Sequence, residues 1–454
     1  MKTKLTLSAL FSTVLLSACG SLLSPGTSAP LPAVPAQWAE QNQATGAYQG
    51  AWWLAFHDAA LTKLIDDALQ SNADLSVAAI RLRRAHLKEG VSEHAALPVV
   101  SGSGSGSVNR SFDPVVNRQS YNLSATASYE FDLWGRLASD RAAAREERIA
   151  TEADRQALKL SISTSVASQY WAIALLDQRL AASTLNLQQL RQASAIAQAK
   201  NQAGALAKSE VLSAGQSLLS EEANHSLLLQ QRKAAFYSLS LLFDRPPQSF
   251  TLAGASLPQG DLPGISAGVP SEVLGRRPDL QAMEARLRAS LAQIDVARAA
   301  FYPSFSLTTS LGGSSSALAE LFQNPVATAG LNLALPFLDW QKHQLNLDIS
   351  RSQYEEQLTT FRQGLYKALA ETEQALDARV RLAEQNQQLA QSLQLAAKLD
   401  GIAQTRFEAG ATDIQPWLDA AARRRSAQTS LLQNRFDQAS NLLAIYKALG
   451  GAVE

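Results

Sequence analysis

The residue with the clearest chemical role is Cys19, the only cysteine among 454 residues. It follows Leu16-Ser17-Ala18, which ends an apolar run that begins at Leu5, and two lysines precede that run. A basic start, a short apolar run and small residues at its end are typical of a secretory signal, and the run is too short for a permanent membrane helix. We expect residues 1–18 to be a signal peptide that is removed, so that Cys19 becomes the mature N-terminus.

The chemistry expected at Cys19 is lipidation. Leu-Ser-Ala-Cys resembles the bacterial lipobox, in which the cysteine carries a covalent lipid, and the alternative is an unmodified cysteine within a leader. Two or more acyl chains on one residue give stable membrane anchoring, whereas a single chain does not. Gly20 and Ser21 follow without an acidic residue, which in lipoproteins favours the outer membrane. We predict no cofactor apart from this lipid. Residues 19–50 contain several prolines and are expected to form an extended tether.

The other residues capable of chemistry do not form a recognisable site. Gly102-Ser103-Gly104-Ser105-Gly106 lacks the Gly-Lys-Ser/Thr that completes a phosphate-binding loop, and there is no Gly-x-Ser-x-Gly elbow. The histidines are not at metal-ligand spacing; they are His57, His86, His94, His225 and His343. We therefore expect no catalytic, cofactor or metal site and no enzyme. The formal net charge is zero, which gives no electrostatic footprint for nucleic acid.

The chain repeats its own sequence at a constant spacing. Asp74-Leu75 recurs as Asp279-Leu280 at an offset of 205, and Ala203-Gly204 recurs as Ala409-Gly410 at an offset of 206. This period is far longer than that of a solenoid repeat. The sequence therefore predicts one internal duplication, with each unit reading helix, two strands, long helix, turn and helix.

Very long helices dominate each unit. Residues 136–203 contain neither proline nor glycine and are rich in helix formers. As one helix this run would extend roughly 100 Å. The partner is expected over about residues 206–243, and the second repeat offers residues 342–407 and 412–449. These hairpins are too long to wrap a globular core, although a cytoskeletal or tethering coiled coil would share the pattern.

Four short segments alternate with a period of two, as strands do. They lie near residues 99–108, 121–131, 305–311 and 327–337, and the last set places Leu335 and Phe337 on one face with Leu331 and Leu333. One apolar face and one small, polar face suit a membrane barrel with a wet lumen. A soluble sandwich or hairpin alternates in the same way, so the strands alone leave both readings open.

Four strands cannot close a membrane barrel, because the smallest single-chain barrels have about eight. An open sheet in lipid would leave unpaired backbone groups, each costing several kcal/mol. Two copies would give a barrel filled by its own side chains, whereas three copies give twelve strands and a lumen. If the strands form a barrel, the sequence favours three chains around an open pore.

Five motifs in this order resemble the outer-membrane factor family of trimeric efflux ducts, and most closely its lipoprotein branch. They are Trp52-Trp53-Leu54-Ala55-Phe56, Phe131-Asp132-Leu133-Trp134-Gly135-Arg136, Gly275-Arg276-Arg277-Pro278-Asp279-Leu280, Phe301-Tyr302-Pro303-Ser304-Phe305-Ser306-Leu307 and residues 406–413. The resemblance implies an α+β membrane protein, a homotrimeric 12-stranded β-barrel with four strands per chain that continues into an α-helical coiled-coil barrel. It also implies a mixed equatorial domain near residues 45–72, 244–275 and the C-terminal end.

The resemblance further implies partners and a site at the hairpin turns. The turns would meet a periplasmic adaptor (membrane fusion) protein, which joins an inner-membrane transporter of the RND type. The expected contacts are Gly204, Ala205, Leu206, Gly410, Ala411, Thr412 and Asp413. The two glycines are also explained by positive φ at a helix end. Gate candidates are Asp419, Gln415 and Arg406. Three copies of Asp419 would form a like-charge ring that binds cations, and the alternative is a solvated helix-surface aspartate.

The expected boundaries follow from these observations. They are 51–97 for the leading helices and equatorial part, 98–132 for strands one and two, 133–243 for the first hairpin, 244–275 for a linker, 276–302 for the second leading helix, 303–338 for strands three and four, 339–449 for the second hairpin and 450–454 for the end. The predicted function is passive export of small toxic compounds across the outer membrane by a lipid-anchored duct reaching into the periplasm. Two alternatives are a protein or oligosaccharide secretion duct and a lipid-tethered periplasmic scaffold without a pore.

Overall fold

The computed structural model describes residues 51–247, 275–323 and 325–451, with the separate positions 35, 37, 38, 252, 255–258, 263 and 270. The chain divides into two units, Met1–Pro35 and Ala36–Glu454, and the elements below belong to the second. Cys19, the predicted signal peptide, most of the tether and most of the 244–275 linker lie outside the described residues.

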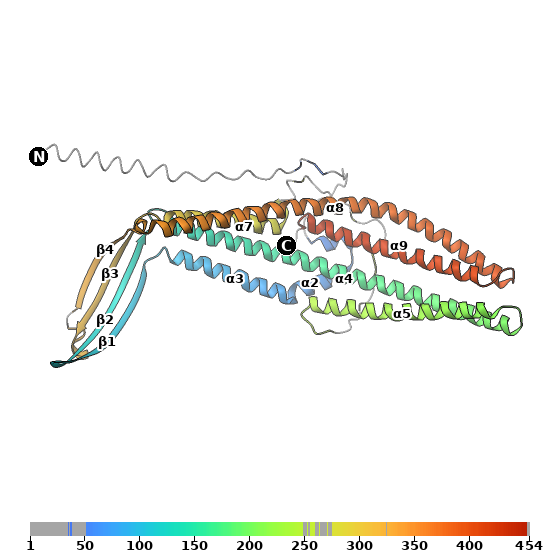
Figure 1. Ribbon diagram of the computed structural model, residues 1–454, viewed down its shortest axis with the longest axis horizontal. Helices are drawn as coiled ribbons and strands as arrows, with labels where there is room; N and C mark the ends of the chain where they lie inside the picture. The colour runs from blue at the N-terminus through green and yellow to red at the C-terminus, as the bar shows by residue number, and fades with distance from the viewer. Residues whose placement is uncertain are drawn as a thin grey trace. The chain divides into compact units, whose positions relative to one another are not determined.

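The same order of elements occurs twice along the chain (Figure 1). After η2 (Trp52–Phe56) and α2 (Ala59–Ser71), the first run is α3 (Ala73–His94), β1 (Val99–Phe112), β2 (Val115–Phe131), α4 (Arg136–Gln202) and α5 (Lys208–Leu242). The second run is α7 (Pro278–Ala299), β3 (Ser304–Ser315), β4 (Pro325–Ala334), α8 (Trp340–Glu408) and α9 (Gln415–Ala448), with the short helices η3 (Leu318–Glu320) and η4 (Pro336–Asp339). The expectation of a mostly helical chain with four strands is confirmed.

The strands form one antiparallel sheet in the order β1-β2-β3-β4, so β1 and β4 are its edges. Its two faces differ because side chains alternate along each strand. On the polar face the Ser103 and Ser124 hydroxyls lie 2.9 Å apart, and the Asn332 amide donates to the Thr308 hydroxyl at 3.1 Å. The opposite face carries Tyr121, Leu123, Tyr129, Phe131, Leu307, Leu311, Leu331 and Leu333.

The fourth strand ends earlier than the alternation predicted. The alternation predicts Leu335 and Phe337 on its apolar face, but β4 stops at Ala334 and Pro336 begins η4. Proline has no N–H for a strand ladder and is favoured at the start of a helix, so it ends the strand here. The first strand is longer than expected and continues to Phe112.

The ends of the strands are joined to the long helices by aromatic contacts. The Trp134 ring stacks on Tyr302 with centroids 4.8 Å apart, and its N–H donates to the Pro303 carbonyl at 2.7 Å. The Arg136 guanidinium contacts both carboxylate oxygens of Glu130 at 2.9 Å. Two motifs that are 169 residues apart in the chain therefore meet and fix the angle between sheet and helices.

A second group of aromatic residues closes the middle of the helical part. Trp52 is 1% exposed and stacks on Tyr446, and its indole N–H donates to the Ser163 hydroxyl at 3.2 Å. Asp58 caps α2 and accepts a hydrogen bond from the Tyr170 hydroxyl at 2.8 Å. This core joins the start of the described chain to α4 and to the end of α9.

The two long hairpins, α4–α5 and α8–α9, place their turns at the end away from the sheet (Figure 1). α4 has 67 residues and α8 has 69, and neither contains proline. Among the described helices, none is both long enough and apolar enough to cross a membrane. Because α4 and α8 are each one long helix, they separate the turns from the sheet.

Candidate functional site at the hairpin tips

Both hairpin turns have the same backbone geometry. Gly204 has φ 75° and Gly410 has φ 73°, and a Cβ at either position would meet nothing within 4 Å. The N–H of Ala205 donates to the Lys200 carbonyl at 2.8 Å, and that of Ala411 donates to the Arg406 carbonyl at 2.9 Å. This is the Schellman ending of a helix, in which glycine is preferred because it adopts positive φ without strain. The glycines are thus required by the turn itself.

One apolar cluster joins the two tips. Phe407 is fully buried and stacks on Trp417, with ring centroids 5.5 Å apart. Ile414 and Leu418 complete the second hairpin's share, and the first hairpin contributes Leu190, Ala193, Ala197 and Ala214. We name this group the tip core. Because both hairpins bury side chains in it, they meet as one unit at this end.

A polar contact also joins the two hairpins. The Lys200 ammonium, at the end of α4, donates to the Phe407 carbonyl at 2.8 Å and lies 4.2 Å from the centre of the Phe407 ring. The last carbonyls of a helix have no partner within the helix and carry partial negative charge, which favours a cation there. Lys200 therefore caps the end of α8 from the other hairpin.

The predicted adaptor contacts differ in accessibility. Five of them are exposed, namely Gly204, Ala205, Gly410, Ala411 and Asp413. Leu206 and Thr412 are half-buried, and Leu206 packs against the tip core. A partner that reaches this end would meet mostly backbone and small side chains.

Two carboxyl groups meet between the tips. Glu210 lies in the first turn of α5, and it interacts with the Asp413 side chain and the Ile414 backbone. Desolvation first, and then the charge of Asp413, raise the pKa of Glu210 above its ordinary value. Glu210 is therefore easier to protonate than an isolated glutamate.

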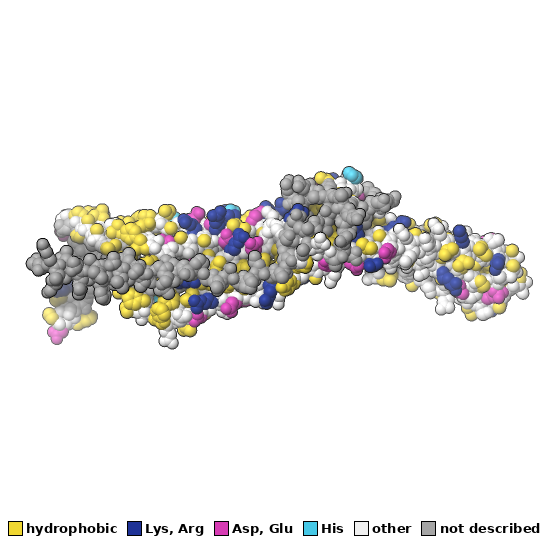
Figure 2. Space-filling view, turned by 90° about the horizontal axis from the view of Figure 1, so that it is seen from above, with side chains coloured by type: hydrophobic (Ala, Val, Ile, Leu, Met, Phe, Trp, Pro, Cys, Tyr) yellow, Lys and Arg dark blue, Asp and Glu magenta, His cyan; other side chains and the backbone are white. Residues whose placement is uncertain are grey.

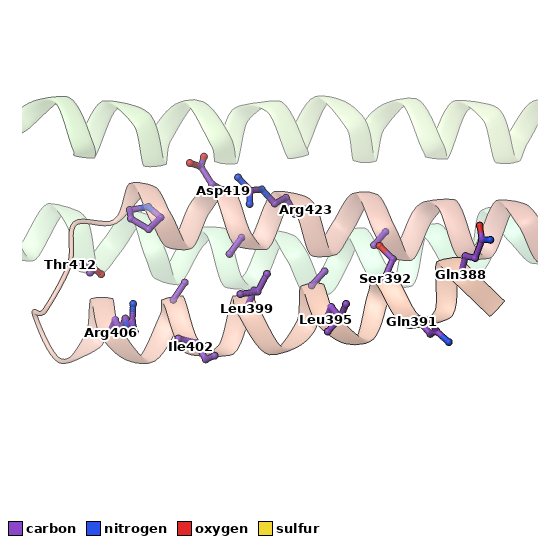
Figure 3. Close-up of a pocket in the computed structure, with 15 residues that line it drawn as sticks. Gln388, Gln391, Ser392, Leu395, Leu399, Ile402, Arg406, Thr412, Asp419 and Arg423 are labelled. Atoms are coloured by element: carbon purple, nitrogen blue, oxygen red, sulfur yellow. The ribbon is translucent and has the colours of Figure 1, made fainter. Parts of the chain in front are cut away.

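The gate candidates lie beside a groove of about 880 Å³ between α8 and α9 (Figure 3). Arg406 comes from α8 and Asp419 from α9, and both line the groove. Gln415 does not line it, but its amide donates to the Asp419 carboxylate at 2.9 Å. The Arg406 side chain forms no hydrogen bond or ion pair with another described residue. Arg406 and Asp419 are therefore brought together in one groove without contacting each other directly.

The groove also holds residues that the sequence analysis did not single out. Leu395, Leu399 and Ile402 form a stripe along α8, and all three are more than half exposed. Their spacing of four and three residues is that of one helix face, so this periodicity was the signal that could have found them. An apolar stripe of this kind favours contact with another protein surface.

A buried ion pair lies further along the hairpins and was also missed. Asp400 is 7% exposed, and its carboxylate lies 2.7 Å from the Arg424 guanidinium. Arg424 also donates to Gln189 on α4 at 2.8 Å. The pair fixes α9 against both α8 and α4, and no sequence spacing indicates it because the residues come from three distant helices.

The junction of sheet and helices carries exposed apolar side chains. Leu338 is 79% exposed and Trp340 is 61% exposed, and Leu133 lies on the corresponding junction of the first repeat. Figure 2 shows hydrophobic side chains gathered at the end that carries the sheet. An exposed tryptophan beside exposed leucines is typical of the interface between a membrane and water.

Comparison with known proteins agrees with this architecture. Residues 64–243 and 269–451 match the family model for outer membrane efflux proteins. The pyoverdine export outer membrane protein OpmQ of Pseudomonas aeruginosa is 30% identical, over 98% of this chain and 96% of that relative. The cation efflux system protein CusC of Escherichia coli is 30% identical, over 96% of this chain and 97% of that relative. The outer-membrane channel OprN has a TM-score of 0.86 at 26% identity, covering 95% of this chain and 99% of OprN.

Proposed function

The chain belongs to the outer membrane efflux protein family, and we propose that three copies of it form a continuous exit duct through the outer membrane and into the periplasm. The chain is thus an efflux protein of the outer membrane, as its family is. In the proposed trimer the sheets close into a 12-stranded barrel, and the hairpins form a coiled-coil barrel below it.

The observation that carries this proposal is the sheet with two bare edges. β1 has 14 residues and β4 has 10, and neither pairs with another strand on its outer side in the described chain. In lipid each unpaired backbone group costs several kcal/mol, so such edges need partners. Three sheets joined edge to edge leave none bare, and twelve strands are enough for a lumen. The hydroxyl-bearing face then lines the water, and the face with Tyr121 and Leu123 meets lipid.

Further features support the same assembly. The exposed Leu133, Leu338 and Trp340 fit the inner boundary of the membrane, where Trp prefers the headgroup level. The family model matches the chain twice, which favours an internal duplication and hence six similar hairpins in a trimer. The exposed stripe of Leu395, Leu399 and Ile402 would be covered by neighbouring copies.

Anchoring and partners complete the proposal. Cys19 carries the lipid and holds the chain to the inner surface of the outer membrane. The hairpin tips, through Gly204, Ala205, Gly410 and Ala411, meet a periplasmic adaptor that connects the duct with an inner-membrane transporter, which we propose is of the RND type. We propose that this transporter supplies the energy for export.

The gate lies at the same end. Asp419 of three copies faces the axis as an acidic ring, with Gln415 holding each carboxylate through the hydrogen bond described above. Like charges at short range repel one another, so closing the ring of Asp419 carboxylates costs free energy. Adaptor contacts favour the open state, in which this repulsion is smaller. The cargo is small toxic compounds.

Gene deletion tests the function in cells. Cells without the chain should become more sensitive to several chemically unrelated compounds and should accumulate them, and a plasmid copy should restore both properties. Unchanged susceptibility together with unchanged export would contradict the proposal. Accumulation of a protein or an oligosaccharide instead of small compounds would redirect it to another cargo.

A further inference from the structure

Two arginines lie at the same level of the sheet but on opposite faces. The turn that joins β1 to β2 lies at the end of the sheet away from the long helices (Figure 1). Near this turn Arg110 is paired with Asn117, and Arg118 is paired with Asn109. Because side chains alternate along a strand, Arg110 lies on the apolar face with Leu123, whereas Arg118 lies on the polar face. In the proposed barrel the first arginine is on the lipid side and the second is in the lumen.

The lipid-side face changes from apolar to polar just before it reaches Arg110. From Phe131 to Tyr121 every residue of β2 on this face is apolar or aromatic, and the next two are Gln119 and Asn117. The Tyr121 hydroxyl donates to the Gln119 side chain at 3.5 Å, as expected where an aromatic girdle meets polar groups. For a strand tilted by about 40°, Asn117 and Arg110 lie roughly 10 Å beyond Tyr121 along the membrane normal. This is the level of lipid headgroups in the outer leaflet.

The surroundings of Arg110 suit a headgroup layer better than open water. Its guanidinium lies over the Phe112 ring, 5.5 Å from the centroid, and Phe112 is 78% exposed. Val108, on the same face, is 66% exposed. The Arg110 side chain forms no ion pair or hydrogen bond with another residue that the structure describes, and this includes Asp113 in the neighbouring turn. The cation is therefore available to an anion from outside the chain.

We propose that Arg110 binds a phosphate group on the sugar headgroup of a phosphorylated glycolipid in the outer leaflet. The Asn117 amide is the second donor to the same phosphate. Val108, on the membrane side of Arg110, packs against the acyl chains, and Phe112, on the outer side, packs against the sugar. This inference rests on the proposed function, because the trimeric barrel is what places Arg110 in this layer.

The chemistry of the two donors fits a phosphate. The planar guanidinium offers paired N–H donors that match two phosphate oxygens. Residues directly opposite each other in an antiparallel pair have Cβ atoms about 4.5–5.5 Å apart, so Asn117 can reach the same group. A phosphate monoester carries a charge of about −1.5 to −2 at pH 7, which attracts a cation more strongly than the single charge of a phosphodiester does.

The first experiment measures lipid binding by the detergent-extracted full-length chain with native mass spectrometry. The probe is lipid A that carries two phosphates, and we expect up to three bound molecules per trimer. Arg110→Gln should weaken binding about fivefold, the effect of one arginine beside an anionic lipid surface. Arg118→Gln is the matched control, because it removes the same charge at the same level from the other face, and it should leave binding unchanged. Equal weakening by both variants would overturn the inference.

The second experiment identifies the group that is bound. Lipid A without its phosphates should bind the unaltered chain about fivefold more weakly, and Arg110→Gln should weaken the binding of this probe no further. Arg110→Lys, which keeps the cation, should bind the phosphorylated probe more tightly than Arg110→Gln does. Equal binding of the two probes by the unaltered chain would contradict the inference. Displacement of the lipid by an equal concentration of inorganic phosphate would show a site for the free ion and would overturn the lipid assignment.

The oligomeric state separates this inference from the function on which it rests. Because Arg110 is exposed and unpaired among the described residues, Arg110→Gln should still form a conducting trimer. A conducting trimer whose lipid binding is unchanged by Arg110→Gln would refute the lipid site and leave the duct intact. A monomeric mass for the unaltered chain would refute the duct itself.

Discussion

Two adjacent residues at the same level of β2 provide a matched test of which face of the sheet meets lipid. Leu123 is paired with Gly104 and Ser124 with Ser103, so their side chains point to opposite faces at one depth. Arginine on the lipid face near the middle of a membrane barrel costs about 2–4 kcal/mol. Three copies of Leu123→Arg would therefore cost about 6–12 kcal/mol per trimer. Ser124→Arg loses the Ser103 hydroxyl contact, which is about 1 kcal/mol per copy, and places its charge in water.

The assay is the amount of heat-resistant trimer in the outer-membrane fraction of cells that express each variant equally. We expect Leu123→Arg to abolish the trimer and Ser124→Arg to leave most of it. If the two variants assembled equally well, the sheet would not lie in lipid. If Ser124→Arg failed and Leu123→Arg assembled, the two faces would be reversed.

Three further predictions concern the tips. Phe407→Ala should destabilise the tip core by about 3–5 kcal/mol, because it removes a fully buried ring stacked on Trp417, and hydrogen exchange of the turn amides should rise while that of the sheet stays unchanged. The folded state raises the pKa of Glu210, so protonated Glu210 stabilises the tip below its ordinary pKa of 4.5, and this stabilisation is lost as the pH rises through the raised value. Hydrogen exchange of the tip amides in the unaltered chain should therefore be slower in acid, after correction for intrinsic exchange rates. Glu210→Gln should remove this pH dependence. Gly410→Val should cost about 1–2 kcal/mol of stability because position 410 has a positive φ, whereas Gly410→Asn should cost less. Thermal unfolding compares the two variants. Equal losses would contradict the explanation from positive φ, since a Cβ at this position would meet no atom within 4 Å.

Local patterns in the sequence predicted the elements but not their contacts. The run without proline or glycine over residues 136–203 indicated one helix, and α4 occupies Arg136–Gln202. The two glycines marked both turns because positive φ is a local requirement. The alternation of small polar and apolar residues predicted the two faces of the sheet. It overran the end of β4 because the apolar rhythm continues through Leu335 and Phe337, while the backbone is ended by Pro336.

The contacts of the candidate site needed the structure. Lys200 and Phe407 are 207 residues apart, and their bond depends on how two hairpins pack. The pairing of Asp400 with Arg424 likewise joins two helices whose relative register no local pattern encodes. The sequence singled out Asp419, Gln415 and Arg406 as gate candidates, and the structure adds that the Gln415 amide donates to the Asp419 carboxylate.

The most direct test of the trimeric duct combines the native mass of the detergent-extracted full-length chain with single-channel recording of the same sample in a planar bilayer. The account predicts a mass of three copies and discrete conductance steps, because three sheets close around a lumen. A stable single copy that conducts no current would contradict it, because the edges of β1 and β4 would then need no partner.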